Sequence, residues 1–580
     1  MRATIPTLLL CIRLAAAILP GQRPLSPAPT AEEFSTFDWT KISAADDLNY
    51  EKCYDKFECS RLTVPLDWRN SSSPHNISLA IVRLPAKVPE SHRDHGGTII
   101  TNPGGPGGSG VQQALSISQR LQELLDGPKY YEILSFDPRG IFHSKPNAYC
   151  FDSAVESEIW YEQKRAAGGL ADGEYPLKYN WAAEQARGQL CANTENGRFE
   201  DGENIRQHLS TAYVARDMLE IVKKVEQRRT AIYRRDNQIP VQASFPTSTP
   251  KIQYVGTSYG TFLGQTFAAM YPDHVGRMLL DANLDPDNWQ ARYEASVDDH
   301  AQIREIFFDA CFSAGPECAF YREYDKTSDD IRARWESLSE ALERAPMFVT
   351  GKGRATPITL DDVRHGFFTA TYQPLFFFKK IAKYLNDLAT GANPGPPFWQ
   401  LPIPTRESFN DELLINRYMG GEVSPAVHCS DGPYLSDESI EGFKTYLTNL
   451  TERYGWGGAI QADFKIPCWT WPASLRTKWR YDGPFNSSVP ILFVNNRLDP
   501  ATPAKNAKKM ANSFNGSVFL EQDSAGHGAM WPPSPCMWQY IKKYMVEGEL
   551  PPPGTVCEPL CRPFEDECEG IDAENYWLFG

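Results

Sequence analysis

The sequence lacks several features that would assign it to particular classes of protein. Beyond its N-terminal stretch, no apolar segment is long enough to cross a membrane without charged residues. There is no internal repeat and no low-complexity tract. Positive charge is also scarce, because 58 Lys and Arg residues face 73 Asp and Glu residues and leave a formal net charge of -15. An acidic surface repels phosphate, so we expect neither nucleic acid nor an anionic membrane as a partner.

A chain of 580 residues is too long for one small domain and suits a large core with an inserted or appended unit. Its residues are 41% hydrophobic and 23% charged. That balance is enough to bury a core and differs from that of a disordered polyampholyte. The composition therefore indicates a folded, acidic protein.

The N-terminus has the layout of a secretory signal peptide. Arg2 precedes an apolar stretch from Ile5 to Leu19, and Pro20 follows it. We assign residues 1–21 to the signal and expect no membrane association once it is cleaved. The alternative, an uncleaved membrane anchor, is disfavoured because the stretch is short for a bilayer span.

Cysteines and glycosylation sequons also favour the secretory route. Of the thirteen Cys residues, Cys11 lies in the signal, and the remaining even number suits disulfides in an oxidising compartment. Zinc is a weak alternative because no matching His or Cys pair completes a tetrahedral set with Cys557 and Cys561. We therefore predict no metal and an extracellular protein, with vacuolar or cell-wall delivery as alternatives. The sequons lie at Asn70, Asn76, Asn449, Asn486 and Asn515.

Short apolar runs alternate with helical patterns along the chain. Each run ends in Gly, Pro, Asp or Asn, as buried strands do. Strands that alternate with helices indicate parallel pairing and an α/β sheet flanked by helices. Helical spacing is clear over 213–224 and 538–546. The expected strands are 96–101, 131–137, 251–255, 277–281, 490–495 and 517–521.

One stretch with two Arg pairs interrupts the alternation. Residues 227–250 carry these pairs ahead of a Pro- and Thr-rich run. The stretch predicts a surface excursion, with proteolytic processing at a dibasic pair, within Arg228–Arg235, as the alternative.

A larger interruption separates the strand that ends at Asp281 from the one that begins at Pro490. It has mostly helical patterns, and an insertion of that size is a subdomain rather than a loop. Placed above the strand ends it would form a large, mainly helical lid. The predicted units are the signal at 1–21, the core at 22–285, the lid at 286–470, the rest of the core at 471–557 and a Cys-containing tail at 558–580.

The segment Gly256-Thr257-Ser258-Tyr259-Gly260 has the pattern G-x-S-x-G directly after a predicted strand and before a helical stretch. The two Gly residues remove side chains that would clash in a sharp turn, and the turn projects the Ser258 hydroxyl. The pattern alone is common by chance, and a Ser in an ordinary Gly-rich turn is the alternative. The strand–turn–helix context favours a nucleophile.

A Ser nucleophile needs a base and an acid that orients the base. In α/β sheets that carry a nucleophile on such a strand–turn–helix, the residues follow along the chain in the order Ser, acid, His. Of the His residues after Ser258, His527 lies in a Gly-flanked loop after the last predicted strand, where such a base belongs. Asp499 follows the preceding strand, whereas its rival Asp523 lies too near His527 in sequence to come from a separate strand end.

An oxyanion hole needs backbone N–H groups that point at the reacting carbonyl oxygen. We predict the N–H of Tyr259 as one donor. The loop NPGGPGGSG at 102–110 supplies the other, with Gly105 favoured over Gly104, because Gly permits the backbone angles required. Phosphate binding is the competing interpretation, but the loop lacks the Lys and the Gly spacing of nucleotide-binding motifs.

These motifs together resemble a known family. NPGGPGGSG, FDPRG at 136–140, GTSYG, the stretch MYPDHVGRMLLDANLDP at 270–286, LDPATP and AGHG are similar, in order, to the secreted tripeptidyl and prolyl aminopeptidases of the α/β-hydrolase fold. The resemblance runs from about residue 47 to 557 and is weak through the lid. Its C-terminal part is similar to that of the tripeptidyl type and implies a Cys536–Cys557 bridge.

The resemblance implies a serine peptidase that releases tripeptides or single residues from peptide N-termini. Ser258 would attack, His527 would carry the proton and Asp499 would orient His527. The family often recognises the free amine with carboxylates near the lid, which makes Asp431 and Glu422 tentative substrate-binding residues. A solvated acidic loop is the alternative for both.

Three classes of function remain. The first is a secreted aminopeptidase with a peptide substrate, the second is an esterase or lactonase on the same scaffold, and the third is a non-catalytic binding protein. Triad chemistry needs no metal or organic cofactor, and the sequence does not predict an oligomeric state. The aromatic stretch Phe367–Phe378 either lines a substrate pocket or forms the core of the lid.

Overall fold

The computed structural model describes seven ranges of the chain, and the predicted signal at 1–21 lies outside them. Most of the predicted tail at 558–580 and the sequence around 240 also lie outside. The described ranges are 37–238, 249–294, 296–351, 353–399, 412–435, 438–530 and 532–565.

A ten-stranded sheet forms the core, in the order β1-β2-β3-β5-β4-β6-β7-β10-β11-β12. Strands β1, β2 and β3 are antiparallel, whereas every pair from β5 to β12 is parallel. The predicted α/β sheet is confirmed. The strands are β1 (Glu51–Cys53), β2 (Phe57–Pro65), β3 (Asn76–Leu84), β4 (His95–Asn102), β5 (Tyr130–Phe136), β6 (Ile252–Thr257), β7 (Val275–Asp281), β10 (Leu492–Leu498), β11 (Val518–Ala525) and β12 (Val556–Cys557).

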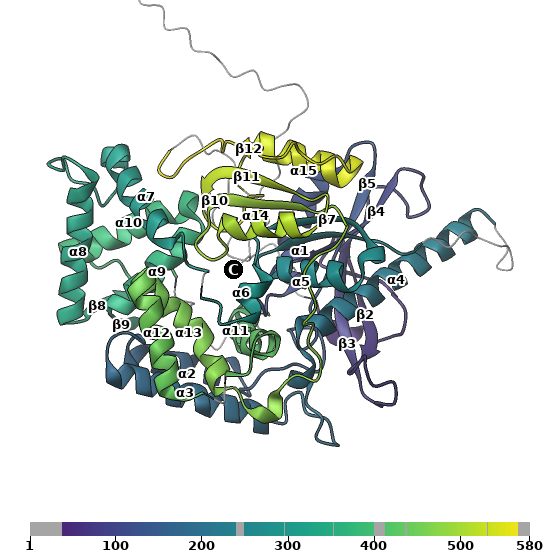
Figure 1. Cartoon of the computed structure of the whole chain (residues 1–580), viewed down its shortest axis with the longest axis horizontal. Helices are drawn as coiled ribbons and strands as arrows, with labels where there is room; N and C mark the ends of the chain where they lie inside the picture. Colours follow the sequence, from purple (N-terminus) through teal and green to yellow (C-terminus); the bar gives the residue numbers. More distant parts are fainter. Residues whose placement is uncertain are drawn as a thin grey trace, which may run out of the picture.

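Helices cover both faces of this sheet (Figure 1). Neighbouring side chains on a strand point to opposite faces, and Leu279 and Leu280 of β7 accordingly join different core clusters. Both are buried, which explains why the central strands read as unbroken apolar runs. Helices α1 (Gly110–Leu125) and α15 (Pro535–Glu547) cover one face, and α4 (Thr211–Asp236), α5 (Tyr259–Met270) and α14 (Ala504–Ser513) cover the other.

The chain between β7 and β10 forms a helical cap beside the core (Figure 1). The cap has a hydrophobic cluster of its own, built from α7 to α10. Its elements are α6 (Pro286–Gln290), α7 (His300–Ala314), α8 (Ser328–Arg344), the hairpin β8 (Met347–Gly351) and β9 (Arg354–Ile358), α9 (Leu360–Tyr372), α10 (Pro374–Thr390), α11 (Glu412–Asp431), α12 (Ile440–Tyr454) and α13 (Trp456–Thr470).

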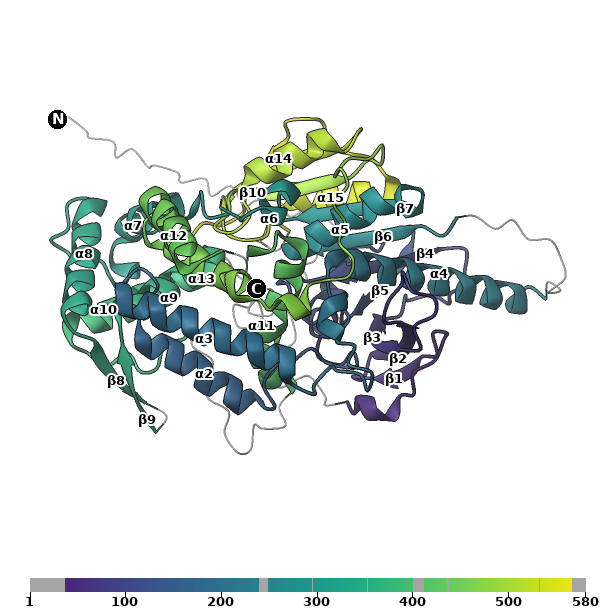
Figure 2. The same ribbon diagram turned by 60° about the horizontal axis from the view of Figure 1, so that its bottom comes forward.

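Two further helices extend the cap from an earlier part of the chain. Figure 2 shows α2 (Ala154–Ala167) and α3 (Glu174–Asn193) alongside α13. The partly buried Lys164 of α2 binds Glu184 of α3 at 2.7 Å and Asp463 of α13 at 3.1 Å. The cap therefore includes residues that the predicted boundaries assigned to the first core segment, 22–285.

The expected surface excursion at 227–250 begins as helix rather than loop. Helix α4 continues to Asp236 and projects from the body of the molecule (Figure 2). Its basic residues pair with acidic ones beside it, as Arg228 does with Glu90 at 3.3 Å. These ion pairs and the good helix propensity of Arg, Glu and Ala stabilise the helical conformation of α4 beyond residue 227.

Five complete disulfides lie within the described residues. They include the Cys536–Cys557 bridge that the family resemblance implied. Within the described part of the chain, no helix has the length and apolar character needed to span a membrane. The other four pairs are Cys53–Cys59, Cys150–Cys191, Cys311–Cys318 and Cys429–Cys468.

Candidate active site

Ser258 lies in a strained turn between β6 and α5. Its backbone has φ 57° and ψ -126°, which is rare for a residue with a side chain and is typical of functional sites. Its N–H donates to the carbonyl of Asp281 at 3.0 Å. A Cβ atom at Gly256 would lie 2.4 Å from the carbonyl oxygen of Gly260, so that tight turn requires glycine.

His527 and Asp499 form a hydrogen-bonded pair. Nδ1 of His527 lies 2.9 Å and 3.0 Å from the two carboxylate oxygens of Asp499. The carboxylate also accepts the N–H groups of Ala501 at 2.9 Å and Thr502 at 2.8 Å, which hold its orientation. Both side chains are buried. The pair has the geometry of a base and its orienting acid.

The rival acid, Asp523, lies elsewhere. One of its oxygens is 2.6 Å from Arg497 and the other 3.8 Å from Arg562, on the partly exposed side of β11. The structure therefore brings Asp499, and not Asp523, to His527.

A second buried carboxylate supports the loop that carries His527. The side chain of Asp281, at the end of β7, accepts the N–H of Ala529 at 2.8 Å and that of Met530 at 3.1 Å. Because the carbonyl of the same residue accepts the N–H of Ser258, Asp281 ties the serine turn to the histidine loop. Burial raises the pKa of Asp281 to about 6, despite these hydrogen bonds.

The charge around the imidazole favours its protonated form. Burial alone lowers the pKa of His527, but the charge and hydrogen bond of Asp499, followed by the charge of Asp281, outweigh it. The net effect raises the pKa of His527 above its ordinary value.

The glycine loop after β4 lies directly against the serine turn. A Cβ atom at Gly104 would be 2.8 Å from Cβ of Ser258 and 2.9 Å from the backbone nitrogen of Tyr259. Gly104 donates its own N–H to Oδ1 of Asn102 at 3.1 Å. Among the described residues, no acceptor is found for the N–H of Gly105, which has φ 103°. Gly105 therefore offers a donor that Gly104 does not.

The two tentative substrate carboxylates are both buried, so the alternative of a solvated acidic loop is wrong. Asp431 is 2% exposed and accepts hydrogen bonds from Thr211, at 2.7 Å and 2.8 Å, and from Trp289 at 3.2 Å. Glu422 is 1% exposed and accepts the N–H of Cys150 at 2.9 Å. Both carboxylates join the cap to the core, because helix α11 carries them and their partners lie on other segments.

The aromatic stretch of the cap divides between two roles. Phe367, Phe377 and Phe378 are buried in the cap's own cluster, as expected for a core. Tyr372 is only partly buried, and its ring lies 5.0 Å from that of His527. The stretch is thus mainly core, with its helix end at the candidate active site.

The cap contains a cavity of about 390 Å³ among α2, α9 and α13. Burial alone would lower the pKa of His365, but its hydrogen bond to Asp361 and nearby carboxylates raise it to about 9. Even with His365 cationic, carboxylates outnumber cations on the walls. The charged lining residues are Glu158, Glu162, Asp361, Asp362 and Asp463, with Lys164, Arg165 and His365 as the cations.

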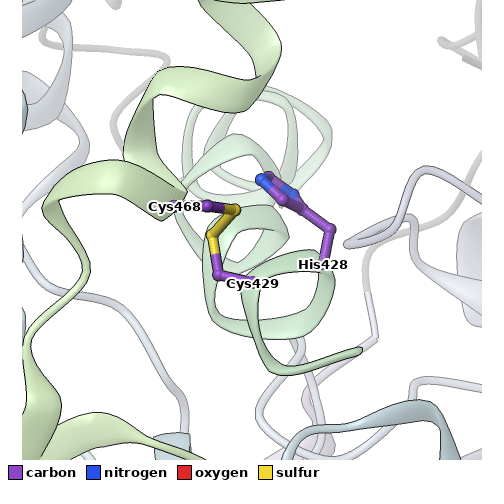
Figure 3. A group of neighbouring side chains, drawn as sticks. All are labelled: His428, Cys429 and Cys468. Carbon is purple, nitrogen blue, oxygen red and sulfur yellow. A yellow bond between two sulfur atoms is a disulfide. The ribbon is translucent and has the colours of Figure 1, made fainter. Parts of the chain in front are cut away.

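One cluster has the spacing of a metal site but not its chemistry. Figure 3 shows His428 beside Cys429 and Cys468, whose sulfur atoms are joined in a disulfide. A disulfide offers no thiolate to a metal ion. The ring of His428 stacks on Phe464 at 4.5 Å, as a buried structural histidine does.

The mostly parallel sheet, its flanking helices and the cap inserted before β10 define an α/β-hydrolase. Comparison with known proteins agrees. A family model described as TAP-like protein matches residues 454–557.

Three relatives extend the similarity over most of the chain. Tripeptidyl aminopeptidase from Streptomyces lividans is 26% identical over 91% of this chain and 87% of its own length. Serine protease Hip1 from Mycobacterium tuberculosis is 26% identical over 86% of this chain and 87% of its own. Carboxylesterase B from the same species is 24% identical over 86% of each chain. The resemblance to tripeptidyl-aminopeptidase-like peptidases is confirmed, and the protein is a serine hydrolase of the peptidase type.

Proposed function

We propose that the protein is an aminopeptidase that cleaves short N-terminal fragments from peptides through Ser258, His527 and Asp499. The observation that carries this proposal is the hydrogen-bonded His527–Asp499 pair, held by Asp281 beside the strained Ser258 turn. Ser258, Asp499 and His527 follow β6, β10 and β11, whose carboxyl ends lie at one edge of the sheet.

In the first half of the reaction, Nε2 of neutral His527 takes the hydroxyl proton as Oγ of Ser258 attacks the scissile carbonyl carbon. The N–H groups of Gly105 and Tyr259 stabilise the oxyanion that forms. The tetrahedral intermediate then breaks its C–N bond, and His527 gives its proton to the leaving amine. Asp499 keeps the imidazole oriented and stabilises its cationic form.

In the second half, water replaces the departed amine. His527 takes a proton from the water, which attacks the ester carbon of the acyl-enzyme. Collapse of this second intermediate returns the proton to Oγ of Ser258 and releases the N-terminal fragment as a carboxylic acid. No metal or organic cofactor takes part in these steps.

The acidic cap cavity supports recognition of a free amino terminus. Within helix α9, His365 lies on the cavity wall, and Tyr372, seven residues later, has its ring 5.0 Å from that of His527. Seven residues of helix rise about 10 Å, and about three residues of extended peptide span the same length. A peptide amine in this cavity would place the scissile bond about three residues along, as tripeptide release requires.

Peptides with a free N-terminus are expected to be cleaved at least about 100-fold faster than their acetylated counterparts, because an acetylated end carries no charge for the cavity's carboxylates. The test measures kcat/KM for matched free and acetylated peptides, with mass spectrometry of the released fragments. Equal turnover of both forms would contradict the aminopeptidase proposal.

An esterase is the second candidate, favoured by the similarity to carboxylesterase B. The triad itself does not choose between amides and esters. Hydrolysis of p-nitrophenyl esters without any turnover of free peptides would identify this alternative.

Secretion forms part of the proposal. Five disulfides support an oxidising compartment. The asparagine of every sequon is exposed and therefore accessible to glycosylation. We propose an extracellular glycoprotein, with the vacuole or cell wall as alternative destinations.

Activity is expected to fall on acidification, because a protonated His527 cannot accept the proton of Ser258. The raised pKa of His527 places the midpoint of this loss above about 6.5, the ordinary value for histidine. Protonation of Asp281, whose pKa is about 6, removes a further negative charge near the pair. Measuring kcat/KM against pH tests this, and a flat profile through the acidic range would exclude His527 as the base.

A further inference from the structure

Asp299 of the cap holds the loop that carries Asp499. It occupies the N-cap position of α7, yet its side chain makes no capping hydrogen bond to that helix. Instead, its Oδ2 accepts the backbone N–H of Asp499 at 3.0 Å, across 200 residues of sequence. An aspartate at an N-cap ordinarily bonds the first turn of its own helix. Here that stabilisation is replaced by a contact to the candidate triad.

The cap also contacts the histidine loop. The backbone N–H of His527 donates to the carbonyl of Tyr372, the last residue of α9, at 2.7 Å. A Cβ atom at Gly526 would lie 2.9 Å from the same carbonyl oxygen, so the loop lies close against the cap. Both loops of the His–Asp pair are therefore bonded through backbone N–H groups to the cap.

We propose that Asp299 is a positioning residue, which keeps Asp499 aligned with His527 by accepting the N–H of Asp499 and so makes triad geometry depend on the docked cap. The inference rests on the proposed function of Ser258, His527 and Asp499. The cap would then take part in the chemistry through Asp299.

The position of the Asp299 carboxylate beside that of Asp499 is not explained by a gain in the stability of the fold. Burial raises the pKa of Asp299 to about 6, and the charge of Asp499 adds to this effect against the hydrogen bond between them. Like charges at close range repel. Removal of the Asp299 carboxylate would leave the buried backbone N–H of Asp499 without its hydrogen-bond acceptor. We expect the loop to shift until this N–H reaches another acceptor. A shift of about 1 Å at a catalytic group can lower a rate about 100-fold.

Asp299→Ala is expected to slow labelling of Ser258 by a small fluorophosphonate about 10- to 100-fold, and to lower kcat for peptides more than it changes KM. Asp299→Asn keeps an acceptor oxygen and should label within about threefold of the wild-type rate. The fluorophosphonate probe reports the reactivity of the serine without needing peptide contacts in the cap. Thermal melting of each variant checks that the protein is folded.

Asp298→Ala is the matched control. Asp298 lies next to Asp299, and its carboxylate pairs with Lys505 of the core and with Tyr454 rather than with the triad loops. Its loss therefore loosens the cap without touching Asp499, and we expect near wild-type labelling.

Three outcomes would overturn the proposal. They are wild-type labelling of Asp299→Ala, equal losses in Asp299→Ala and Asp298→Ala, and failure of Asp299→Asn to restore the rate. If the alanine variant does not fold, Asp299→Leu replaces it, because leucine keeps the branching of the side chain at Cγ, fills the space of the removed carboxylate and lacks the acceptor. Absence of labelling in the wild type would instead reject the proposed function itself.

Discussion

Ser258→Ala is expected to lower peptide turnover by about 10⁶-fold and to abolish labelling by a fluorophosphonate. The substitution removes the only atom that forms the acyl-enzyme bond in the proposed reaction, and neither His527 nor the oxyanion donors can replace it. Alanine accepts the same backbone angles with the same strain, so the turn and the fold should persist. Labelling of the secreted protein, followed by mass spectrometry of the modified peptide, measures the effect.

Ser513→Ala is the matched control for this substitution. Ser513 ends α14, and its hydroxyl donates to the carbonyl of Lys509 at 3.1 Å, away from the serine turn. The control should label and turn over peptide like the wild type. A wild-type protein that is folded yet never labels would favour the non-catalytic binding protein, and a labelled Ser258→Ala would place the nucleophile elsewhere.

Asp499→Asn is expected to lower kcat by about 10⁴-fold. Asparagine has nearly the same shape, so the Asn variant keeps the packing of the loop. Its neutral amide cannot stabilise an imidazolium by charge. The amide also permits the tautomer in which Nδ1 of His527 has no proton and Nε2 carries it, and in that tautomer Nε2 cannot act as a base. Steady-state kinetics at several pH values measure the loss.

Asp523→Asn provides the comparison for that variant. It removes the rival carboxylate, which pairs with Arg497 at 2.6 Å on the partly exposed side of β11. We expect a change of less than about 1 kcal/mol in stability and no loss of turnover. A large loss in Asp523→Asn with a small one in Asp499→Asn would reverse the assignment of the acid.

The central strands could be predicted from sequence because burial on both faces makes them continuous apolar runs. Each of the six expected strands overlaps an observed one, from β4 to β11. Strands β2 and β3 were not predicted. In β2 the alternation of apolar and polar residues is broken where Ser60 and Arg61 stand side by side, which weakens the local strand signal, and the pairing with β3 supplies what the pattern lacks.

The candidate site also has parts that a local sequence pattern predicts and parts that depend on residues far apart in the chain. The serine turn, the histidine loop and the glycine loop each have a local pattern that predicts their conformation. Asp281 and Asp299 have none, because their hydrogen bonds reach groups 248 and 200 residues away. The burial of Asp431 and Glu422 was missed for the same reason, since their partners Thr211 and Cys150 lie on segments far along the chain.

The sequence by itself determined the α/β class, the hydrolase motifs and the identity of the three residues proposed for catalysis. Local interactions are sufficient to predict these features, because strand patterns, glycine turns and side-chain chemistry are properties of a few neighbouring residues. Only the tertiary structure decided that α2 and α3 join the cap, that Asp281 bridges two loops and that the cap bonds to the acid and base loops. Those arrangements depend on which distant groups must satisfy one another once they are buried together.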